Sequence, residues 1–322
     1  MSRHPQQLIN ECAHELALTV GELMAIAKTA PKRYYVWEIP KRSGTGCRTV
    51  CHPARELKAV QYYFLNNIVN SLPVHENATA YVSGSSIKKN AEAHVQSRVL
   101  MKLDFANFFN SLKVSNWSIY AQDHFSHWSD QELHFSARML FWGSGTYHPK
   151  CLAIGAPTSP LLSNALMYEL DVKLTAFANE AGLRYTRYAD DITFSSTDFL
   201  DYGKTLEAVK GALASAKYTA VKINADKTIL VSKKSMRRVT GLVITPDHKI
   251  SLGRERKRLI SAMVHRAFCR TLSHSELMTL SGLLAFAADA EPAFVERLFV
   301  KYEHDLIKRI MSYAAREIPS EV

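Results

Sequence analysis

The adjacent carboxylates Asp190 and Asp191 stand in the stretch LRYTRYADDITFSS, residues 183–196. β-prone residues flank them on both sides, which predicts two strands joined by a tight turn. No cation within the turn neutralises both charges. Hard cations such as Mg²⁺ prefer carboxylate oxygens, so the pair indicates a divalent-metal site. A solvated Asp-Asp turn is the alternative, and further ligands from elsewhere in the chain would decide against it.

A third carboxylate follows an apolar run. Residues 99–103 predict a buried strand, with Asp104 at its C-terminal end. A charge at that place is costly unless it meets a cation or strong donors, so Asp104 is the natural third ligand. Three such carboxylates can hold two Mg²⁺ ions roughly 3.5–4 Å apart. That arrangement serves nucleotidyl transfer or a nuclease, and the carboxylates alone do not separate the two.

A basic hairpin precedes these strands. Residues 34–39 and 48–51 predict two strands around a glycine turn, with Lys41, Arg42 and Arg48 near its tip. A turn of this kind suits phosphate groups, although a solvated basic turn fits the pattern equally well. Two helices are predicted before it within residues 6–29, the second opened by a capping box of Thr19 and Glu22.

The remaining elements alternate helices and strands. A loop containing Gly155 leads to a helix that starts at Ser159 and ends at Gly182, and the small loop lets backbone or substrate approach closely. A strand pair is predicted around residues 224–227, followed by a hairpin that turns at Pro246 and Asp247. Helices follow from Arg254 to the end of the chain.

Composition and charge narrow the class of protein. The chain has 322 residues, 47% of them hydrophobic and 22% charged, which describes a globular protein with a large core. Lys and Arg number 40 against 30 acidic residues, a net charge of +10. A positive excess attracts nucleic acid through its phosphates, although many basic proteins have no such partner.

Residues 249–270 concentrate this charge. They hold one acidic residue and seven basic ones: Lys249, Arg254, Arg256, Lys257, Arg258, Arg266 and Arg270. A basic helical module at the end of the chain is suited to clamping the backbone of a duplex, with a solvated charged face as the alternative.

Cysteines and apolar runs bear on the compartment. The five cysteines are scattered, and Cys47, Cys51 and His52 lack a second ligand pair, so free thiols in a reducing cytosol are favoured. The N-terminus carries no apolar leader and no run approaches about 20 apolar residues. We therefore expect a cytoplasmic protein with no membrane partner.

At this point the chain resembles a reverse transcriptase over nearly its whole length. LDFANFF is similar to the palm segment that carries the first metal aspartate, IGAPTSP to the loop that follows, and YADD to the Tyr-x-Asp-Asp hairpin. NADKT is similar to the next palm segment, and IPKRSGTGCRTVCHPARELKAVQ to the fingers. The order and spacing of the five together are specific.

The resemblance implies an α+β right-hand polymerase fold, with fingers, a palm of antiparallel sheet with packed helices, and a short helical thumb. The expected divisions are an N-terminal helical segment over 1–33, fingers over 34–98, and a first palm part over 99–112. An insertion over 113–150, the rest of the palm over 151–245 and the thumb over 246–322 complete them.

Two further segments resemble the retron reverse transcriptases of bacteria. Residues 90–94, Asn-Ala-Glu-Ala-His, fit the Asn-Ala-x-x-His segment of that family, and residues 239–241 fit its Val-Thr-Gly triplet. Taken alone, His94 reads as a structural histidine. The family implies a cognate noncoding RNA, priming from the 2′-hydroxyl of an internal guanosine, and a branched product, msDNA. It also implies an effector protein as partner in an anti-phage defence module.

The resemblance also implies roles for single residues. Asp104, Asp190 and Asp191 would bind two Mg²⁺ ions, assisted by the Phe105 carbonyl. Arg48, Lys41 and Gly155 would contact the incoming dNTP, Phe109 would exclude a 2′-hydroxyl, and Lys227 would protonate pyrophosphate. The residues implied in nucleic-acid binding are Asn90, His94, Val239, Thr240, Gly241, Arg254, Arg256, Lys257 and Arg258.

One position departs from the family pattern. The loop before Gly155 usually begins with Gln, and here Ile154 stands there, which cannot hydrogen-bond near the nucleotide sugar. The metal carboxylates are unaffected, so we expect an active enzyme. Two other hypotheses stay open: an msDNA-bound scaffold that restrains a toxic effector, and a reverse transcriptase of an abortive-infection or diversity-generating lineage. A nuclease is a more distant alternative.

Overall fold

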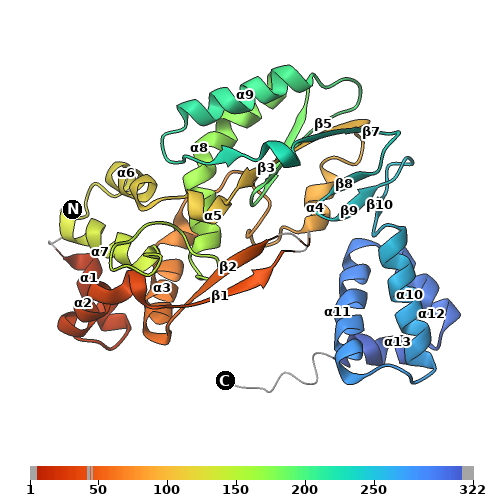
Figure 1. The fold of residues 1–322 in the computed structure, drawn as a ribbon, viewed down its shortest axis with the longest axis horizontal. Helices are drawn as coiled ribbons and strands as arrows, with labels where there is room; N and C mark the ends of the chain where they lie inside the picture. The colour runs from red at the N-terminus through yellow and green to blue at the C-terminus, as the bar shows by residue number, and fades with distance from the viewer. Residues whose placement is uncertain (1–5, 42–43, 45, 314–322) are drawn as a thin grey trace. The chain divides into compact units, whose positions relative to one another are not determined.

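The computed structural model describes residues 6–41, 44 and 46–313 (Figure 1). The chain forms two compact units. Unit 1 comprises residues 1–85, 101–194 and 200–230, and unit 2 comprises residues 86–100, 195–199 and 231–322. Residues 1–5 and 314–322, which belong to the predicted N-terminal segment and thumb, lie outside the described part, as does Arg42 at the predicted hairpin tip.

Unit 1 contains most of the helices and the largest sheet. Its longer helices are α1 (Gln7–Glu15), α2 (Val20–Thr29), α3 (Arg55–Asn67), α6 (Val114–His124), α7 (Asp130–Leu140), α8 (Ser159–Glu180) and α9 (Tyr202–Ser215). The short helices are η1 (Ala30–Lys32), η2 (Val69–Ser71), α5 (Phe108–Ser111) and η3 (Ala225–Lys227). Its strands are β1 (Tyr34–Pro40), β2 (Cys47–Pro53), β3 (Val99–Ala106), β4 (Arg184–Tyr188), β5 (Asp191–Ser196), β6 (Lys222–Ile223) and β7 (Ile229–Ser232), some of which run on into unit 2.

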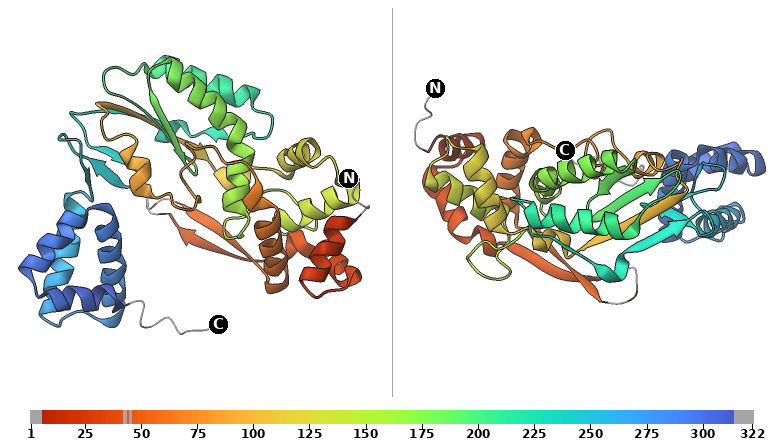
Figure 2. Two further views of the ribbon diagram at one scale, coloured as in Figure 1. Left: turned by 180° about the vertical axis from the view of Figure 1, so that it is seen from behind. Right: turned by 90° about the horizontal axis from the view of Figure 1, so that it is seen from above.

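The central sheet has the order β4-β5-β3-β6, and β7 also pairs with β3. β3 and β5 are therefore neighbours, which brings the strand of Asp104 beside the strand that begins with Asp191. Helices α8 and α9 contact each other and run side by side in both views of Figure 2. A sheet with helices packed on it confirms the predicted α+β class.

β3 is longer than expected. We predicted a strand that ends just before Asp104, but the strand continues to Ala106 and Asp104 lies inside it. The extension has a partner, because β6 pairs antiparallel with Phe105 and Ala106. In addition, the Asn224 N–H donates to the Asp104 carbonyl at 2.7 Å. β6 and β7 were expected to pair with each other, and both instead pair with β3.

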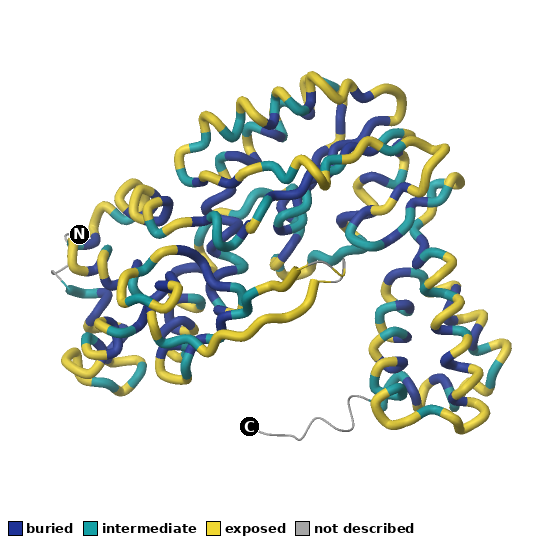
Figure 3. The backbone as a smooth tube through the Cα atoms, viewed as in Figure 1, coloured by how far each residue is buried: buried dark blue, intermediate teal, exposed yellow. Residues whose placement is uncertain are grey.

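Local signals at the N-terminus are confirmed. Thr19 caps α2, and its hydroxyl and backbone exchange hydrogen bonds with Glu22 in a capping box. β1 and β2 form the predicted hairpin in antiparallel register, with Tyr34 opposite Pro53 and Pro40 opposite Cys47. Every residue of β1 after Tyr34 is exposed, so most of this hairpin appears yellow in Figure 3. β1 therefore presents most of its residues to solvent.

Unit 2 joins a short helix, a three-stranded sheet and a helical bundle. Its helices are α4 (Ile87–Glu92), α10 (Arg254–Phe268), α11 (His274–Ala290), α12 (Pro292–Lys301) and α13 (His304–Met311). Its own sheet has the order β10-β9-β8, from β8 (Arg237–Val239), β9 (Leu242–Ile244) and β10 (Ile250–Ser251). One apolar cluster holds the unit together, including Leu242, Ile260, Leu284 and Ile307.

The two units do not coincide with the predicted divisions. Residues 86–98, which we placed with the fingers, belong to the same compact unit as the thumb residues. The boundaries of fingers, palm and thumb therefore stay predictions.

Candidate active site

The predicted carboxylate hairpin is present. β4 ends at Tyr188, β5 begins at Asp191, and the turn between them consists of Ala189 and Asp190. Ala189 has φ +56°, the left-handed region that costs a residue with a Cβ about 1–2 kcal/mol. Hairpin turns with one left-handed residue at this position prefer Gly there. The turn is therefore strained, and its neighbours must hold it in place.

One neighbour is β3. The N–H of Phe105 donates to the carbonyl of Asp190 at 3.0 Å, so the turn is tied to the residue that follows Asp104. The Phe105 side chain is buried and stacks on Phe108, with ring centroids 6.1 Å apart. Whether the Phe105 carbonyl assists a metal ion stays a prediction.

The carboxylates influence each other's ionisation. Burial raises the pKa of Asp190, and repulsion from Asp191 and Asp104 raises it further. Burial also raises the pKa of Asp191; the charge of Lys102 opposes that rise and Asp104 adds to it. The three carboxylates therefore form one cluster of like charge, which a divalent cation would relieve.

Asp104 has a cation beside it. The Lys227 ammonium donates to its two carboxylate oxygens at 3.0 and 2.9 Å, and the Asn224 amide lies 3.4 Å from Oδ1. The Asp104 side chain is 10% exposed and that of Lys227 57% exposed. Lys227 is the last residue of η3, within the NADKT segment that resembles a palm segment. Its ion pair brings it together with Asp104, and both are predicted catalytic residues.

The carboxylate oxygens of Asp104, Asp190 and Asp191 are ligands of the kind that a divalent ion prefers. However, the three side chains are not grouped around a single point. Within residues 6–41, 44 and 46–313, no three Asp, Glu, His or Cys side chains are grouped as ligands. In addition, the ammonium of Lys227 engages both oxygens of Asp104. Asp104, Asp190 and Asp191 could hold a metal if Asp104 released the exposed ammonium of Lys227.

Of the two predicted triphosphate contacts, the structure places Arg48 near the cluster. Its positive charge lowers the pKa of both Asp190 and Asp191 against the stronger effects that raise them. Lys41 lies at the exposed end of the β1–β2 hairpin, where its N–H donates to the Gly46 carbonyl. Arg48 is therefore the better placed of the two.

Gly155 meets β2 in this structure. It has φ +111°, and a Cβ there would lie 3.1 Å from the Cys51 carbonyl. The Cys51 N–H donates to the Ile154 carbonyl at 2.7 Å. The close approach that we predicted at this glycine is thus made by the backbone of β2. The nucleotide contact predicted for Gly155 stays a prediction.

Phe109 has an aromatic neighbour that the sequence did not single out. The Tyr81 ring lies with its centroid 6.2 Å from that of Phe109. Tyr81 is 41% exposed and has φ +65°. Burial raises its pKa to about 12, and the charge of Asp190 adds to the rise. Tyr81 is therefore a neighbour both of the predicted 2′-hydroxyl gate, through its ring, and of the Asp190 charge, through its pKa.

The two segments that resemble retron enzymes lie together in unit 2. Thr240 and Gly241 form the β8–β9 turn, with φ +45° and +82°. The Thr240 hydroxyl donates to the Ile87 carbonyl of α4 at 2.9 Å, and the Asn90 amide lies 3.5 Å from that hydroxyl. The pairing of these distant segments could not be read from the sequence.

Most side chains that we predicted to contact RNA in these two segments are buried. Asn90 and His94 are each 1% exposed, and Val239 is fully buried. His94 shares a hydrogen bond of 2.7 Å with the Ser195 hydroxyl. Such burial favours a structural role for these three side chains, because a buried group cannot reach RNA without a rearrangement. Thr240 and Gly241 are partly exposed.

The basic residues at the start of α10 divide into two kinds. Lys257 pairs with Glu291 at 3.0 Å, and Arg256 lies over the Phe286 ring and donates to the Gly241 carbonyl. Arg254 and Arg258 are exposed, and neither forms an ion pair within the described residues. Among the four residues of α10 that the resemblance implies in nucleic-acid binding, these two therefore have guanidinium groups available for phosphates.

No helix in the described ranges combines the length and apolar character that a membrane crossing requires.

Comparison with known proteins agrees with these features. Residues 39–244 match the family model described as reverse transcriptase (RNA-dependent DNA polymerase). Retron Ec83 reverse transcriptase of Escherichia coli is 36% identical over 292 residues, covering 90% of this chain and 93% of that protein. Retron Ec73 reverse transcriptase of Escherichia coli is 33% identical over 84% of this chain and 87% of its own length.

Among solved structures, a foamy viral protease–reverse transcriptase in complex with double-stranded DNA is similar at a TM-score of 0.46. It is 19% identical, with 88% of this chain and 44% of that chain covered. The family assignment rests on the sequence matches, which span both the carboxylate hairpin and Asp104. The chain belongs to the retron reverse transcriptases, with the right-hand polymerase fold and the RNA-directed DNA polymerase activity of that family.

Proposed function

We propose that the enzyme copies part of a cognate noncoding RNA into branched msDNA, starting from the 2′-hydroxyl of an internal guanosine. The observation that carries this proposal is the attachment of the Asp190 turn to β3, the strand that contains Asp104 and its ion pair with the exposed Lys227. The relatives named above are retron enzymes, which supports a product of the retron type.

Asp104, Asp190 and Asp191 would hold two Mg²⁺ ions, with the Phe105 carbonyl as an additional ligand. Bound there, the ions would lower the pKa of the attacking hydroxyl and offset the charge of the triphosphate. The raised pKa values of Asp190 and Asp191 support this role, because gathered like charges favour a divalent cation.

The other residues of the site bind and orient the nucleotide. Arg48 would hold the triphosphate, since its guanidinium acts on Asp190 and Asp191 from β2. Lys227 would give a proton to pyrophosphate after leaving Asp104, to which its exposed side chain is bound. Phe109, backed by Tyr81, would stand against a 2′-hydroxyl and favour dNTPs over ribonucleotides.

Unit 2 would hold the RNA and its DNA copy. The exposed guanidinium groups of Arg254 and Arg258 are suited to phosphates. Arg256 and Lys257 are engaged within the unit, so they would act by fixing α10 and the Thr240–Gly241 turn. Replacing Arg254 and Arg258 by Ala should reduce the slope of log affinity against log salt by about 2, close to 1 per contact. An unchanged slope would remove them from the interface.

We further propose that the enzyme and its msDNA act with an effector protein in anti-phage defence. Infection of cells with and without the catalytic residues would test this role. We expect protection to disappear in the Asp190→Asn, Asp191→Asn variant, and full protection by that variant would contradict it.

The reaction itself tests the proposal. Purified protein with its upstream RNA, dNTPs and Mg²⁺ should yield DNA joined to RNA through a 2′–5′ link, detected by sensitivity to a debranching enzyme. The exposed carboxylate variant Asp198→Asn is the matched control and should retain synthesis. DNA extended only from a 3′-hydroxyl would contradict the priming step while leaving the polymerase activity intact.

A further inference from the structure

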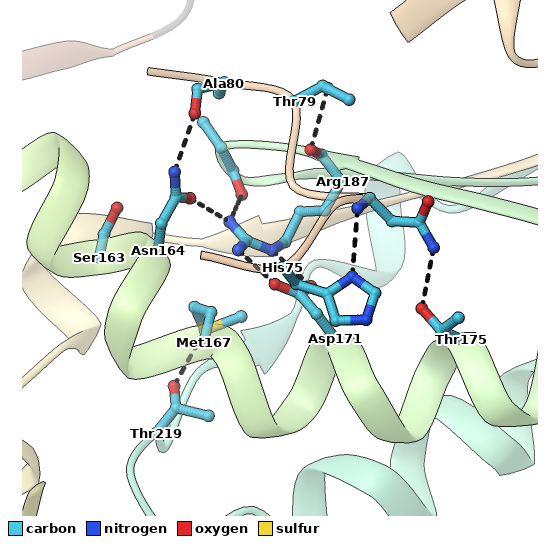
Figure 4. Close-up of polar contacts among 12 residues, drawn as sticks. His75, Thr79, Ala80, Ser163, Asn164, Met167, Asp171, Thr175, Arg187 and Thr219 are labelled. Atoms are coloured by element: carbon cyan, nitrogen blue, oxygen red, sulfur yellow. Dashed lines mark hydrogen bonds and ion pairs between the residues drawn. The ribbon is translucent and has the colours of Figure 1, made fainter. Parts of the chain in front are cut away.

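A buried ion pair lies behind the carboxylate turn. Arg187 of β4 and Asp171 of α8 both have side chains that are 0% exposed. The guanidinium meets the carboxylate in a fork, with Nε to Oδ1 at 2.8 Å and Nη2 to Oδ2 at 2.6 Å (Figure 4). Burial acts to lower the pKa of Arg187, but the Asp171 charge outweighs it and the net effect raises that pKa. Arg187 therefore stays charged inside unit 1.

The remaining end of the guanidinium reaches the turn. Nη1 of Arg187 donates to Asn164 Oδ1 at 3.1 Å and to the Ala189 carbonyl at 3.2 Å. Asn164 and Asp171 are seven residues apart on α8, two turns along one face, so the helix holds both partners of Arg187. Ala189 is the left-handed residue of the turn. A rigid helix thus holds, through one side chain, the strained residue next to Asp190.

The turn is consequently fixed from two sides. Arg187 holds the Ala189 carbonyl, and the Phe105 N–H holds the Asp190 carbonyl. Repulsion among Asp104, Asp190 and Asp191 acts to separate these elements. Two backbone anchors on successive residues oppose that separation.

The same network reaches the aromatic pair. The Asn164 amide donates to the Ala80 carbonyl at 2.8 Å, as Figure 4 shows. Tyr81 follows directly, with its left-handed φ and its ring against Phe109. Arg187 and Asn164 therefore connect the carboxylate turn to the segment that presents Tyr81.

We propose that Arg187, fixed by Asp171 and Asn164, is a positioning residue that sets the carboxylate turn for catalysis. This inference rests on the proposed metal role of Asp190 and Asp191. Stability alone does not account for the pair, because buried ion pairs can often be replaced by apolar residues without loss of stability. A guanidinium is needed here because it binds a carboxylate in a fork and still has donors for Ala189.

The test separates positioning from folding. In the variant Arg187→Met, Asp171→Leu, Tyr185→Phe, both charges are removed, together with the Tyr185 hydroxyl that donates to Asp171. We expect a melting temperature within a few degrees of the parent enzyme. The kcat for DNA synthesis should fall about 100-fold, because small misplacements at a reacting centre have effects of that size. KM for dNTP should change less than about threefold, and Mn²⁺ should bind more weakly by water-proton relaxation.

A folded variant with kcat and Mn²⁺ affinity unchanged would overturn the proposal. If this variant does not fold, Arg187→Lys decides. Lysine keeps a charge beside Asp171 but cannot bind it in a fork and also hold Ala189. We expect kcat to fall at least about tenfold in the folded fraction with weaker Mn²⁺ binding, and parental values of both would overturn the proposal.

Two controls isolate the effect. Arg138 also holds backbone carbonyls in unit 1, those of Ala27 and Lys28, so Arg138→Met should lower the melting temperature and leave kcat unchanged. Asp190→Asn, Asp191→Asn tests the role on which the inference depends. If that variant still makes DNA, the proposed metal site fails; if it is inactive while the apolar triple variant is fully active, only the role of Arg187 fails.

Discussion

Two ion pairs lie near the carboxylate turn, and they differ in the burial of the cation and in the type of cation. Arg187 and Asp171 are fully buried, joined by a fork, and held between a helix and a strand. Lys227 and Asp104 join a largely exposed ammonium to a nearly buried carboxylate. A buried guanidinium cannot leave without stranding a charge, whereas an exposed lysine is free to exchange partners. The first pair is suited to setting geometry and the second to changing during the reaction.

Replacing Asp104 should have the largest effect on the rate of DNA synthesis. Asp104→Asn removes the charge of a proposed metal ligand and the partner of Lys227 together. We expect DNA synthesis to fall by about 10³-fold or more, measured as the initial rate of dNTP incorporation at saturating Mg²⁺, because an amide is a poor substitute for a carboxylate at a metal. A rate within tenfold of the parent would show that Asp104 is not a ligand.

Lys227 gives the next largest effect on rate. Lys227→Arg keeps a cation beside Asp104 but supplies a group that does not release a proton near neutral pH. We expect single-turnover synthesis to slow about 100-fold, in the range found for general acids, with the melting temperature unchanged. Full activity in Lys227→Arg would indicate that the lysine contributes only charge.

The loss of folding stability on breaking each ion pair should differ between the two pairs. Asp171→Asn leaves the Arg187 charge buried without a counter-charge, which costs about 3–5 kcal/mol and lowers the melting temperature on the order of 10 °C. Lys227→Met removes an exposed partner and should cost about 1 kcal/mol or less. Thermal unfolding of the two variants checks this directly. Equal losses would erase the distinction between a fixed pair and an exchangeable one.

The smallest effect concerns pH. The folded-state pKa of Asp190 lies above its usual 3.8 because of burial, Asp191 and Asp104. Its ionised form therefore destabilises the fold at neutral pH, and this cost disappears as pH falls through the raised pKa towards 3.8. Without divalent cations, Asp190→Asn should raise the melting temperature at pH 7.5 by a few degrees, and the gain should vanish near pH 4. A gain independent of pH would exclude repulsion as its cause.

Features with local signals were predictable from the sequence. The Thr19–Glu22 capping box, the β1–β2 hairpin and the Asp190–Asp191 turn depend on residues close together in the chain. Helix caps and strand alternation act over a few residues, so their outcome is written in the local sequence.

Features that depend on distant partners were not predictable. Asp104 lies inside β3 because Ile223 and Lys222 pair beyond it, 118 and 116 residues along the chain. Some sequence patterns do indicate burial. Arg187 is two residues after Tyr185, on the same face of a predicted strand, and Asp171 lies between Leu170 and Leu174 in a predicted helix. Nothing in the sequence says which buried cation meets which buried anion, because that depends on how α8 packs on β4.

The same reason applies to Asn90 and His94. Their spacing matches a family segment, yet their burial follows from packing against β8, β9 and Ser195, which lie far along the chain. A resemblance can assign a segment to a family without indicating which of its side chains face a ligand.

The most direct test is the nucleic acid that co-purifies with the enzyme. Sequencing it from cells that make the parent protein should give DNA joined to its template RNA by a 2′–5′ link, and the Asp190→Asn, Asp191→Asn variant should carry the RNA alone. Branched DNA on that variant, or unbranched nucleic acid on the parent, would contradict the account.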